Sequence, residues 1–407
     1  MSSESINKGV SKKVSYCELE NNGIGFWSIF TFFAVLILLG IGAFNYMHHH
    51  GHYVTGMNNQ IVWGMPHVFA IFLIVSASGA ANIATIGTVF GNKTYQPLGR
   101  LSLLLAGSLL VGGLMVLLLD LGKISNVIEM AKGAINFKSI FAWNMILYSG
   151  FIAIIVVYLW TMMDRIKSAK SLYRPLGVAN MVWRFLLTMG TGSIFGFLVA
   201  RQYYDAAILA PLFISASYVF GTAVYSLLII STFTLTKRDL GNAVIKRLRR
   251  SLPLFITAVL FFEFVRHLTN LYATEHHGVE TYILSGDMFS LLFWFGQIII
   301  GSILPMILLW GAWFKNHTLA LVSASILVII GGFIQLYIII IGGQSYPLIL
   351  FPNAEISSLF ADGVFNDYSA TLSEYLLGFG GIGISFCIVM IGMKIFRMLP
   401  TTLAEPS

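Results

Sequence analysis

The sequence has few charged residues. Asp, Glu, Lys and Arg make up only 10% of its 407 positions, whereas 57% are hydrophobic. Soluble globular domains carry about 25% charged residues. So little charge cannot cover the surface of a water-soluble protein of this length. The composition therefore excludes a soluble enzyme and predicts an all-α, polytopic membrane protein.

Cysteine is almost as scarce: the chain has only Cys17 and Cys387, far apart in sequence. An iron–sulfur cluster is usually held by four cysteine thiolates. We therefore expect no such cluster and no covalently bound cofactor in this chain. The first apolar segment is too long for a signal peptide and lacks an A-x-A-like cleavage site, so we expect it to remain as a helix.

Ten segments each approach the roughly 20 apolar residues that a helix needs to cross a bilayer. They lie at 25–46, 63–90, 99–121, 139–161, 176–199, 206–233, 253–272, 287–312, 318–342 and 371–396. We expect two groups of four helices, at 63–199 and 200–342, flanked by the first and tenth helices. The remaining parts are a tail at 1–24, a first helix with an outer loop at 25–62, and an outer loop, helix and tail at 343–407.

Lysine and arginine are unevenly distributed over the segments that join these helices. With a cytoplasmic N-terminus, 18 of the 24 lie in cytoplasmic segments and 4 on the opposite side. Short cytoplasmic loops are enriched in these residues. We therefore expect a multi-pass protein of the bacterial inner membrane with both termini in the cytoplasm. The net charge of +7 then reflects topology and does not indicate binding of nucleic acid.

Ionisable residues inside membrane helices are costly and are functional candidates by default. On this topology the inner half of the bilayer holds Arg184 and almost no other charge, whereas polar groups gather in the outer half. Those groups are His67, Asp120, Asn144, Tyr148, Asp205, Glu263, Arg266 and His267. A transporter usually binds near the midplane between broken helices. Polar groups under one surface instead favour an amphiphile that enters from the lipid.

A quinol is such an amphiphile, and its oxidation releases two protons with two electrons. His67 carries the side chain that titrates near neutral pH without perturbation, as a base for a quinol hydroxyl requires. Asp120 is a candidate to take or relay the second proton, and Asn144 and Tyr148 to bind the head group. Structural roles stay open: an inter-helix hydrogen bond for His67, an ion pair with Lys123 for Asp120, and an interfacial position for Tyr148.

Histidines also raise the question of a metal or a haem. The motif MHHHGH contains His48, His49, His50 and His52, but adjacent histidines in a loop seldom complete a tetrahedral site, so we expect no metal there. A b-type haem would need two facing membrane histidines. His67 and His267 are the one pair at similar depth, which leaves a haem-bearing subunit as an alternative.

Four stretches resemble the NrfD-like membrane subunits of polysulfide reductase and related complexes, in their ten-helix form. Within about residues 63–312, they are LGRLSLLLAGSLLVGGLMVLLLDLGK, NFKSIFAWNMILYSGF, LAPLFISASYVFGTAVYSLL and SLLFWFGQIIIGSILPMILL. Their order and spacing carry the resemblance. Two positions depart from the pattern of the family: Lys123 stands where arginine is usual, and Ile140 stands where proline is usual after Ser139.

The resemblance implies a subunit of a respiratory oxidoreductase that carries no redox cofactor itself. It implies that menaquinone or ubiquinone binds near the outer face, in the first four-helix group. Electrons would pass to or from a ferredoxin-like iron–sulfur subunit on the periplasmic face, often joined to a molybdopterin enzyme. By location, His67, Asp120, Asn144 and Tyr148 match this quinone site.

The second four-helix group offers a candidate proton path, since some members of the family are proposed to couple redox work to proton movement. Its candidate residues are Glu263, Arg266, His267, Arg184 and Asp205. Two alternatives to the whole interpretation remain: a secondary transporter, and a passive membrane anchor of a redox complex.

Overall fold

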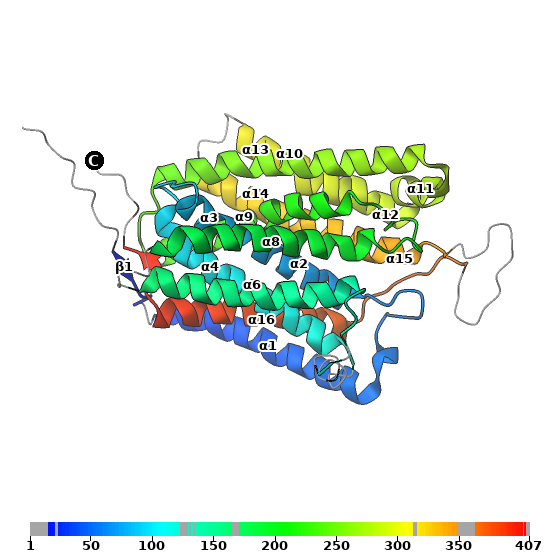
Figure 1. Ribbon diagram of the computed structural model, residues 1–407, viewed down its shortest axis with the longest axis horizontal. Coiled ribbons are helices and arrows are strands. Elements are labelled where there is room, and N and C mark those ends of the chain that lie inside the picture. The colour runs from blue at the N-terminus through cyan, green and yellow to red at the C-terminus, as the bar shows by residue number, and fades with distance from the viewer. Residues whose placement is uncertain are drawn as a thin grey trace, which may run out of the picture.

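The computed structural model describes residues 15–20, 23–122, 129, 132–133, 135–164, 171–311, 316–348, 363–401 and 403. Long helices run side by side along the whole molecule, and the described residues add only one two-stranded sheet (Figure 1). The chain is an all-α, polytopic membrane protein. The basic tail at 1–14 and Lys123 lie outside the described residues.

In the described part of the chain, nine helical spans are long and apolar enough to cross a membrane. Most are single helices: α1 (Ile24–His50), α6 (Ile140–Met163), α9 (Leu209–Leu235), α10 (Asn242–Tyr272) and α16 (Leu372–Ile395). The others join two or more elements: α2 and α3 (Met65–Ala80, Asn82–Thr88), η2 and α4 (Gln96–Leu98, Gly99–Asp120), α12, η4 and α13 (Asp287–Leu291, Leu292–Ile303, Leu304–Trp310), and α14, η5 and α15 (His317–Tyr337, Ile338–Gly342, Gly343–Ser345).

The tenth expected span, 176–199, is present as helix α8 (Tyr173–Gly196). Its 24 residues would extend about 36 Å at 1.5 Å per residue, enough to cross the hydrocarbon core. It is absent from the nine apolar spans. The buried polar side chains Asn180, Arg184, Thr188 and Thr191 lower its apolar content.

Some elements differ from the sequence expectations. Helix α10 begins at Asn242, about three turns before residue 253, so the whole basic segment IKRLRRS is helical. The stretch between the expected spans 253–272 and 287–312 is not simply a loop, because it contains η3 (Thr274–His276) and α11 (His277–Ser285). Two membrane helices contain π-helical stretches, η4 and η5. Such stretches are rare and often mark functional sites, and hydrophobic periodicity does not reveal them.

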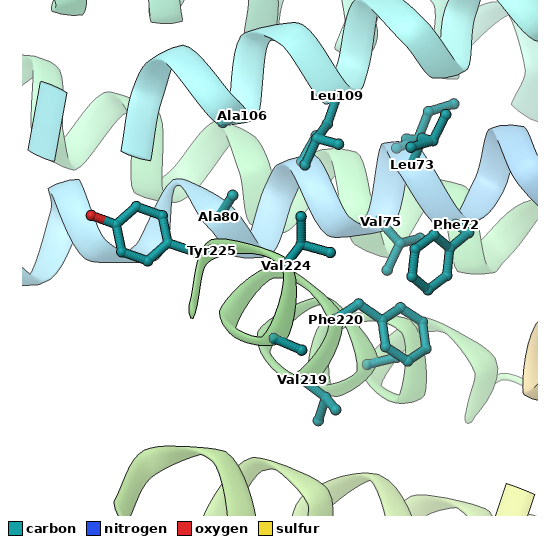
Figure 2. Close-up of a cluster of buried hydrophobic side chains, with 14 of the residues drawn as sticks. Phe72, Leu73, Val75, Ala80, Ala106, Leu109, Val219, Phe220, Val224 and Tyr225 are labelled. Atoms are coloured by element: carbon teal, nitrogen blue, oxygen red, sulfur yellow. The ribbon is translucent and has the colours of Figure 1, made fainter. Parts of the chain in front are cut away.

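Helix α2 lies at the centre of the bundle and packs against α4 and α9 (Figure 2). The ring of Phe72 on α2 stacks on that of Phe220 on α9, with centroids 5.2 Å apart. A Cβ added to Gly221, next to Phe220, would lie 2.2 Å from the carbonyl carbon of Gly79, so only glycine allows this crossing. Because α2 and α9 come from the two expected four-helix groups, their contact joins the groups.

We call the two ends of the bundle the site end and the basic end. The site end is where α2, α6 and α16 begin and where α4 and α10 finish; the basic end is where α4, α10 and α14 begin. At the basic end, on the left of Figure 1, β1 (Tyr16–Cys17) pairs antiparallel with β2 (Leu399–Pro400). Both terminal segments are therefore anchored at the same end of the bundle.

Candidate functional site

His67 and Asp120 meet at the site end. His67 is the third residue of α2, after Pro66 in the first helical turn, where a missing backbone donor costs nothing. Asp120 is the last residue of α4. Nδ1 of His67 lies 3.0 Å from Oδ2 of Asp120, and the histidine side chain is 23% exposed whereas that of the aspartate is 1% exposed. The structure therefore pairs the two residues that the sequence proposed as proton acceptors.

The Asp120 carboxyl group is unusually short of donors. Its pairing with His67 is close but not aligned as a hydrogen bond, and neither carboxylate oxygen accepts one from the described residues. A buried charge without hydrogen bonds is costly. The ion pair with Lys123 proposed from the sequence involves a residue outside the described part of the chain. The arrangement leaves Asp120 with capacity for a proton or a polar ligand group.

Trp63 forms an aromatic wall beside the pair. Its ring stacks on His67 with centroids 6.1 Å apart and contacts Phe141 of α6, Phe195 of α8 and Tyr204. The indole therefore brings the beginnings of α2 and α6 and the final turn of α8 to one place. A planar apolar surface next to a partly exposed base suits a flat aromatic ligand.

The loop that carries Trp63 is held from the second half of the chain. Oε1 of Gln344 accepts hydrogen bonds from the backbone N of Val62 and of Trp63, at 2.9 and 3.0 Å, and its Nε2 donates to the Trp63 carbonyl at 2.9 Å. Arg201 donates to the carbonyls of Gln60 and Gln344. Gln344 was not predicted from the sequence, because its amide side chain carries no charge that would mark it as a functional candidate.

A buried carboxylate holds the other side of the same loop. Glu374, at the start of α16, accepts hydrogen bonds from the backbone N of Gly56 and Thr371 and from the hydroxyl of Tyr368. The Tyr368 oxygen in turn accepts from the backbone N of Met65 at 2.6 Å. Burial raises the pKa of the Tyr368 phenol, so it remains a donor at neutral pH. The first turn of α2, with His67, is fixed by this network.

Asn144 and Tyr148 lie on the face of α6 that packs on α8. Nδ2 of Asn144 donates to the carbonyls of Ile140 and Gly190 at 2.9 and 3.0 Å, and its Oδ1 has no partner among the described residues. The Tyr148 hydroxyl lies 3.1 Å from Oγ1 of Thr191. Both side chains are buried. No hydrogen bond or ion pair among the described residues joins them to His67, so the structure places them in the same helix group without bonding them to the pair.

One histidine of the MHHHGH motif lies against the turn that follows Asp120. The ring of His52 packs against the turn after α4, where a Cβ on Gly122 would lie 3.2 Å from its Nε2. Gly122 has φ of +68°, which favours glycine. The described residues contain no group of three or more His, Cys, Asp or Glu side chains placed to hold a metal ion.

A second buried cluster surrounds Glu263 on α10. Its Oε1 accepts hydrogen bonds from Nε2 of Gln297 at 2.9 Å and of Gln335 at 2.7 Å. Its Oε2 lies 3.6 Å from both Nη1 of Arg266 and Nε2 of His267. Glu263, Arg266 and His267 therefore form one cluster, and their i, i+3 and i, i+4 spacing places them on one face of α10.

Glu280 of α11 completes the cluster and was not anticipated. His267 donates from Nδ1 to its Oε2 at 2.6 Å, and Asn270 donates to its Oε1 at 2.7 Å. Burial alone would raise the pKa of Glu280, but these hydrogen bonds and the charge of Arg266 outweigh it and lower the pKa below its ordinary value of 4.5. Little in the sequence indicated Glu280, because it lies between two expected membrane spans, where a loop was expected.

A small cavity of about 20 Å³ continues the second cluster toward the middle of the bundle. Gln297, Ser302 and Gln335 contribute polar atoms to its walls, and Gly301 and Gly331 lie beside them. This volume holds about one water molecule. Gln297, Gly301 and Ser302 belong to the π-helical stretch η4, whose wider turn places these three residues at the cavity.

Arg184 and Asp205 do not join this cluster. Arg184 is buried on α8, where it donates to the Ser78 carbonyl and the Tyr218 hydroxyl, both at 3.4 Å, and contacts the Phe185 ring. No described acid pairs with Arg184. Asp205 is exposed in the loop before α9. Of the five residues predicted to form a proton path, three lie together in the Glu263 cluster, whereas Arg184 and Asp205 each lie elsewhere.

Polar contacts run along one face of α8. Asn180 donates to Thr85 at 3.3 Å, Thr188 donates to Ser78 at 2.6 Å, and Thr191 meets Tyr148. With Arg184 between them, these α8 residues recur every three or four positions, so they share the side of the helix that faces α2 and α6. Only Arg184 was anticipated from the sequence, since hydroxyl and amide residues carry no charge to mark them.

The sequence is similar to those of known proteins over nearly the whole chain. Residues 53–347 match the family described as polysulphide reductase, NrfD. The "Hdr-like menaquinol oxidoreductase integral membrane subunit" of Archaeoglobus fulgidus is 25% identical over 96% of this chain and 98% of its own length. A selenate reductase subunit of Mesobacillus selenatarsenatis is 26% identical over 90% of this chain and 93% of its own length. The matched region contains both the His67–Asp120 pair and the Glu263 cluster, and the chain belongs to the NrfD family of polysulphide reductase membrane subunits.

Proposed function

We propose that this protein is the quinol-binding membrane subunit of a respiratory oxidoreductase complex, with His67 and Asp120 as its proton acceptors. The observation that carries the proposal is their pairing at 3.0 Å, with a partly exposed imidazole backed by a buried carboxylate. The name of the Archaeoglobus fulgidus relative, which matches nearly the whole chain, supports menaquinol as the substrate.

The geometry supports a role for each ring nitrogen of His67. Nδ1 of His67 faces Asp120, which leaves Nε2 to accept the hydrogen bond of a quinol hydroxyl. As that proton moves to Nε2, the Asp120 carboxylate stabilises the imidazolium, and it takes the Nδ1 proton once the two groups align as a hydrogen bond. The quinol loses two protons and two electrons in all. The protons pass through this pair, and the electrons leave for a partner subunit with iron–sulfur clusters.

The electron acceptor must lie close to the quinol, because this chain has only two cysteines for a cluster of its own. We place that ferredoxin-like subunit, joined to a molybdopterin-type or other catalytic subunit, against the site end. The concentration of Lys and Arg at the basic end supports a cytoplasmic location for that end and for both termini. The site end then faces the outside.

The test is quinol-dependent reduction of the iron–sulfur clusters in the purified complex. His67→Ala and Asp120→Asn are compared with His49→Ala and Asp367→Asn, which remove the same groups from exposed positions. Loss of a positioned base costs about 10²–10⁴ in rate, so we expect losses of at least about 100-fold for the first two variants only. Reduction of artificial dyes should be unchanged in all four.

Wild-type rates in both His67→Ala and Asp120→Asn would overturn this assignment. If quinol also had no effect on the wild-type clusters, the chain would be a passive anchor. Transport of a solute by liposomes that contain the chain alone would instead favour a secondary transporter. A visible absorption spectrum of the purified chain tests the haem-bearing alternative, since a b-type haem would give a Soret band.

A second part of the proposal concerns proton movement. With His67 and Asp120 releasing protons at one surface, the Glu263 cluster and its cavity provide buried groups for transfer toward the middle of the bundle. The α8 face around Arg184 provides another polar path. Proton release per electron in proteoliposomes tests this. Glu263→Gln should lower the ratio while quinol oxidation continues, and an unchanged ratio would remove the cluster from the path.

A further inference from the structure

A cavity with a distinct chemistry lies at the basic end, far from both clusters. It has a volume of about 490 Å³ and lies between the first turns of α10, the end of α13 and the start of α14. Its polar lining is basic: Lys246, Arg247, Arg249, Arg250 and His317, beside Trp310. No acidic residue that the structure describes lines it. A cavity of this composition favours a ligand with negative charge.

Arg249 prepares this cavity for an anion. Its Nε and Nη2 donate to the carbonyls of Leu309 and Gly311 at 2.8 and 2.9 Å, and its Nη1 donates to Nδ1 of His317. The last carbonyls of a helix carry partial negative charge. By bonding to them, Arg249 removes the acceptors at the end of α13 that would repel an anionic group.

Two cations at the mouth have no partner in the described part of the chain. Lys246 and Arg250 are exposed and lie four residues apart on the same face of α10. Like charges at this spacing repel each other. Arg247 differs, because it donates to Oδ1 of Asn92 at 2.6 Å. An anion between Lys246 and Arg250 would relieve their repulsion.

An apolar surface begins directly below the cavity. Leu254 on α10 and Ile307 and Trp310 on α13 are exposed large apolar side chains, at 64%, 48% and 60%. They belong to helices that cross the membrane, so they face lipid. Tryptophan at the end of such a helix is typical of the membrane–water interface. The cavity therefore lies where a head group ends and acyl chains begin.

We propose that this cavity binds the phosphate group of an anionic phospholipid, between Lys246, Arg250 and the Arg249-capped end of α13. Its acyl chains lie along the apolar surface of α10 and α13. Basic pockets between membrane helices on this side are known to suit such head groups. The combination of a head-group cavity and adjoining apolar surface distinguishes a lipid from free phosphate, which would use only the cavity.

The test titrates phosphatidylglycerol, with phosphatidylcholine of the same acyl chains as comparison, into the delipidated full-length protein and counts bound lipid by native mass spectrometry. Lys246→Gln/Arg250→Gln is compared with Lys93→Gln/Lys237→Gln, which removes two exposed cations elsewhere at the same end. We expect the first pair to weaken phosphatidylglycerol binding by about tenfold or more and the second to leave it unchanged.

Three results would overturn the proposal. They are equal loss in both double variants, equal affinity of the wild type for the two lipids, and displacement of the lipid by millimolar inorganic phosphate. Lys246→Arg/Arg250→Lys, which keeps both charges, should bind as the wild type does. If it fails to bind while its thermal unfolding is unchanged, charge at the two positions is not what holds the lipid.

Discussion

Gln344 makes two hydrogen bonds to Trp63, 281 positions away in sequence, and a third to the adjacent Val62. Two of these hydrogen bonds are accepted from the backbone N of Val62 and Trp63, just before α2, and the third is donated to the Trp63 carbonyl. The aromatic wall beside His67 is therefore positioned by a side chain from the last turn of α14–α15. Movement of that helix would move the wall.

Gln344→Ala should impair the site without removing any residue that touches the quinol. It leaves the backbone N of Val62 and Trp63 unpaired in a part-buried place, at a cost of about 1–3 kcal/mol in stability. We expect a higher KM for quinol and a lower thermal unfolding temperature, with Gln96→Ala, an exposed amide, as the control. Unchanged KM in a destabilised variant would limit Gln344 to a structural role.

Glu280→Gln should reduce stability in a pH-dependent way. The pKa of Glu280 is lower in the folded protein than its ordinary value, so its carboxylate stabilises the fold above about pH 4.5. That contribution disappears as the pH falls through the lowered pKa. We expect the wild type to exceed the variant by about 2 kcal/mol at pH 7, the strength of charge-assisted hydrogen bonds.

The measurement is thermal unfolding in detergent from pH 7 downward, with the exposed Glu275→Gln as the matched control. The difference between the wild type and Glu280→Gln should shrink at low pH. A difference that stays constant with pH would show that the carboxylate charge is not what stabilises the cluster.

Glu263 and Arg266 should be coupled in stability. Glu263→Gln leaves a fully buried guanidinium without its nearer carboxylate, and breaking a buried pair in this way costs about 3–5 kcal/mol. Arg266→Met in addition removes the stranded cation, so the double variant should recover much of the loss. A double-mutant cycle by thermal unfolding measures the coupling, and additive losses would contradict it.

The contact of α2 with α9 should tolerate no side chain at its crossing. Gly221→Leu places atoms where the backbone of Gly79 lies, so we expect loss of the folded protein from the membrane fraction. Gly42→Leu is the matched control, since a Cβ at Gly42 meets no other atom within 4 Å. Folded, monodisperse Gly221→Leu protein in size-exclusion chromatography would show that the two helices can separate without cost.

The long helices could be predicted from the sequence because an apolar run of a given length has only one stable form in a bilayer. The pairing of His67 with Asp120 was also accessible, since consecutive antiparallel helices bring the start of one to the end of the other. Boundaries were less accessible where charge continues a helix beyond the membrane, as at the beginning of α10.

The remaining parts of the site depend on contacts between distant segments. Glu374 reaches Gly56 and Gln344 reaches Trp63, and neither pair leaves a local pattern in the sequence. Glu280 was missed because its short helix folds back onto α10. The position of Asp205 shows the opposite error: polarity at the right depth did not mean burial in the cluster.

The pairing of β1 with β2 limits how many times the chain can cross the membrane. Each passage through the bilayer reverses the side on which the chain emerges, so two ends fastened together require an even number of passages. The nine apolar spans of the described residues would leave the ends on opposite sides. We therefore predict that helix α8 makes the passage that restores the even number, which would carry its buried arginine across the membrane.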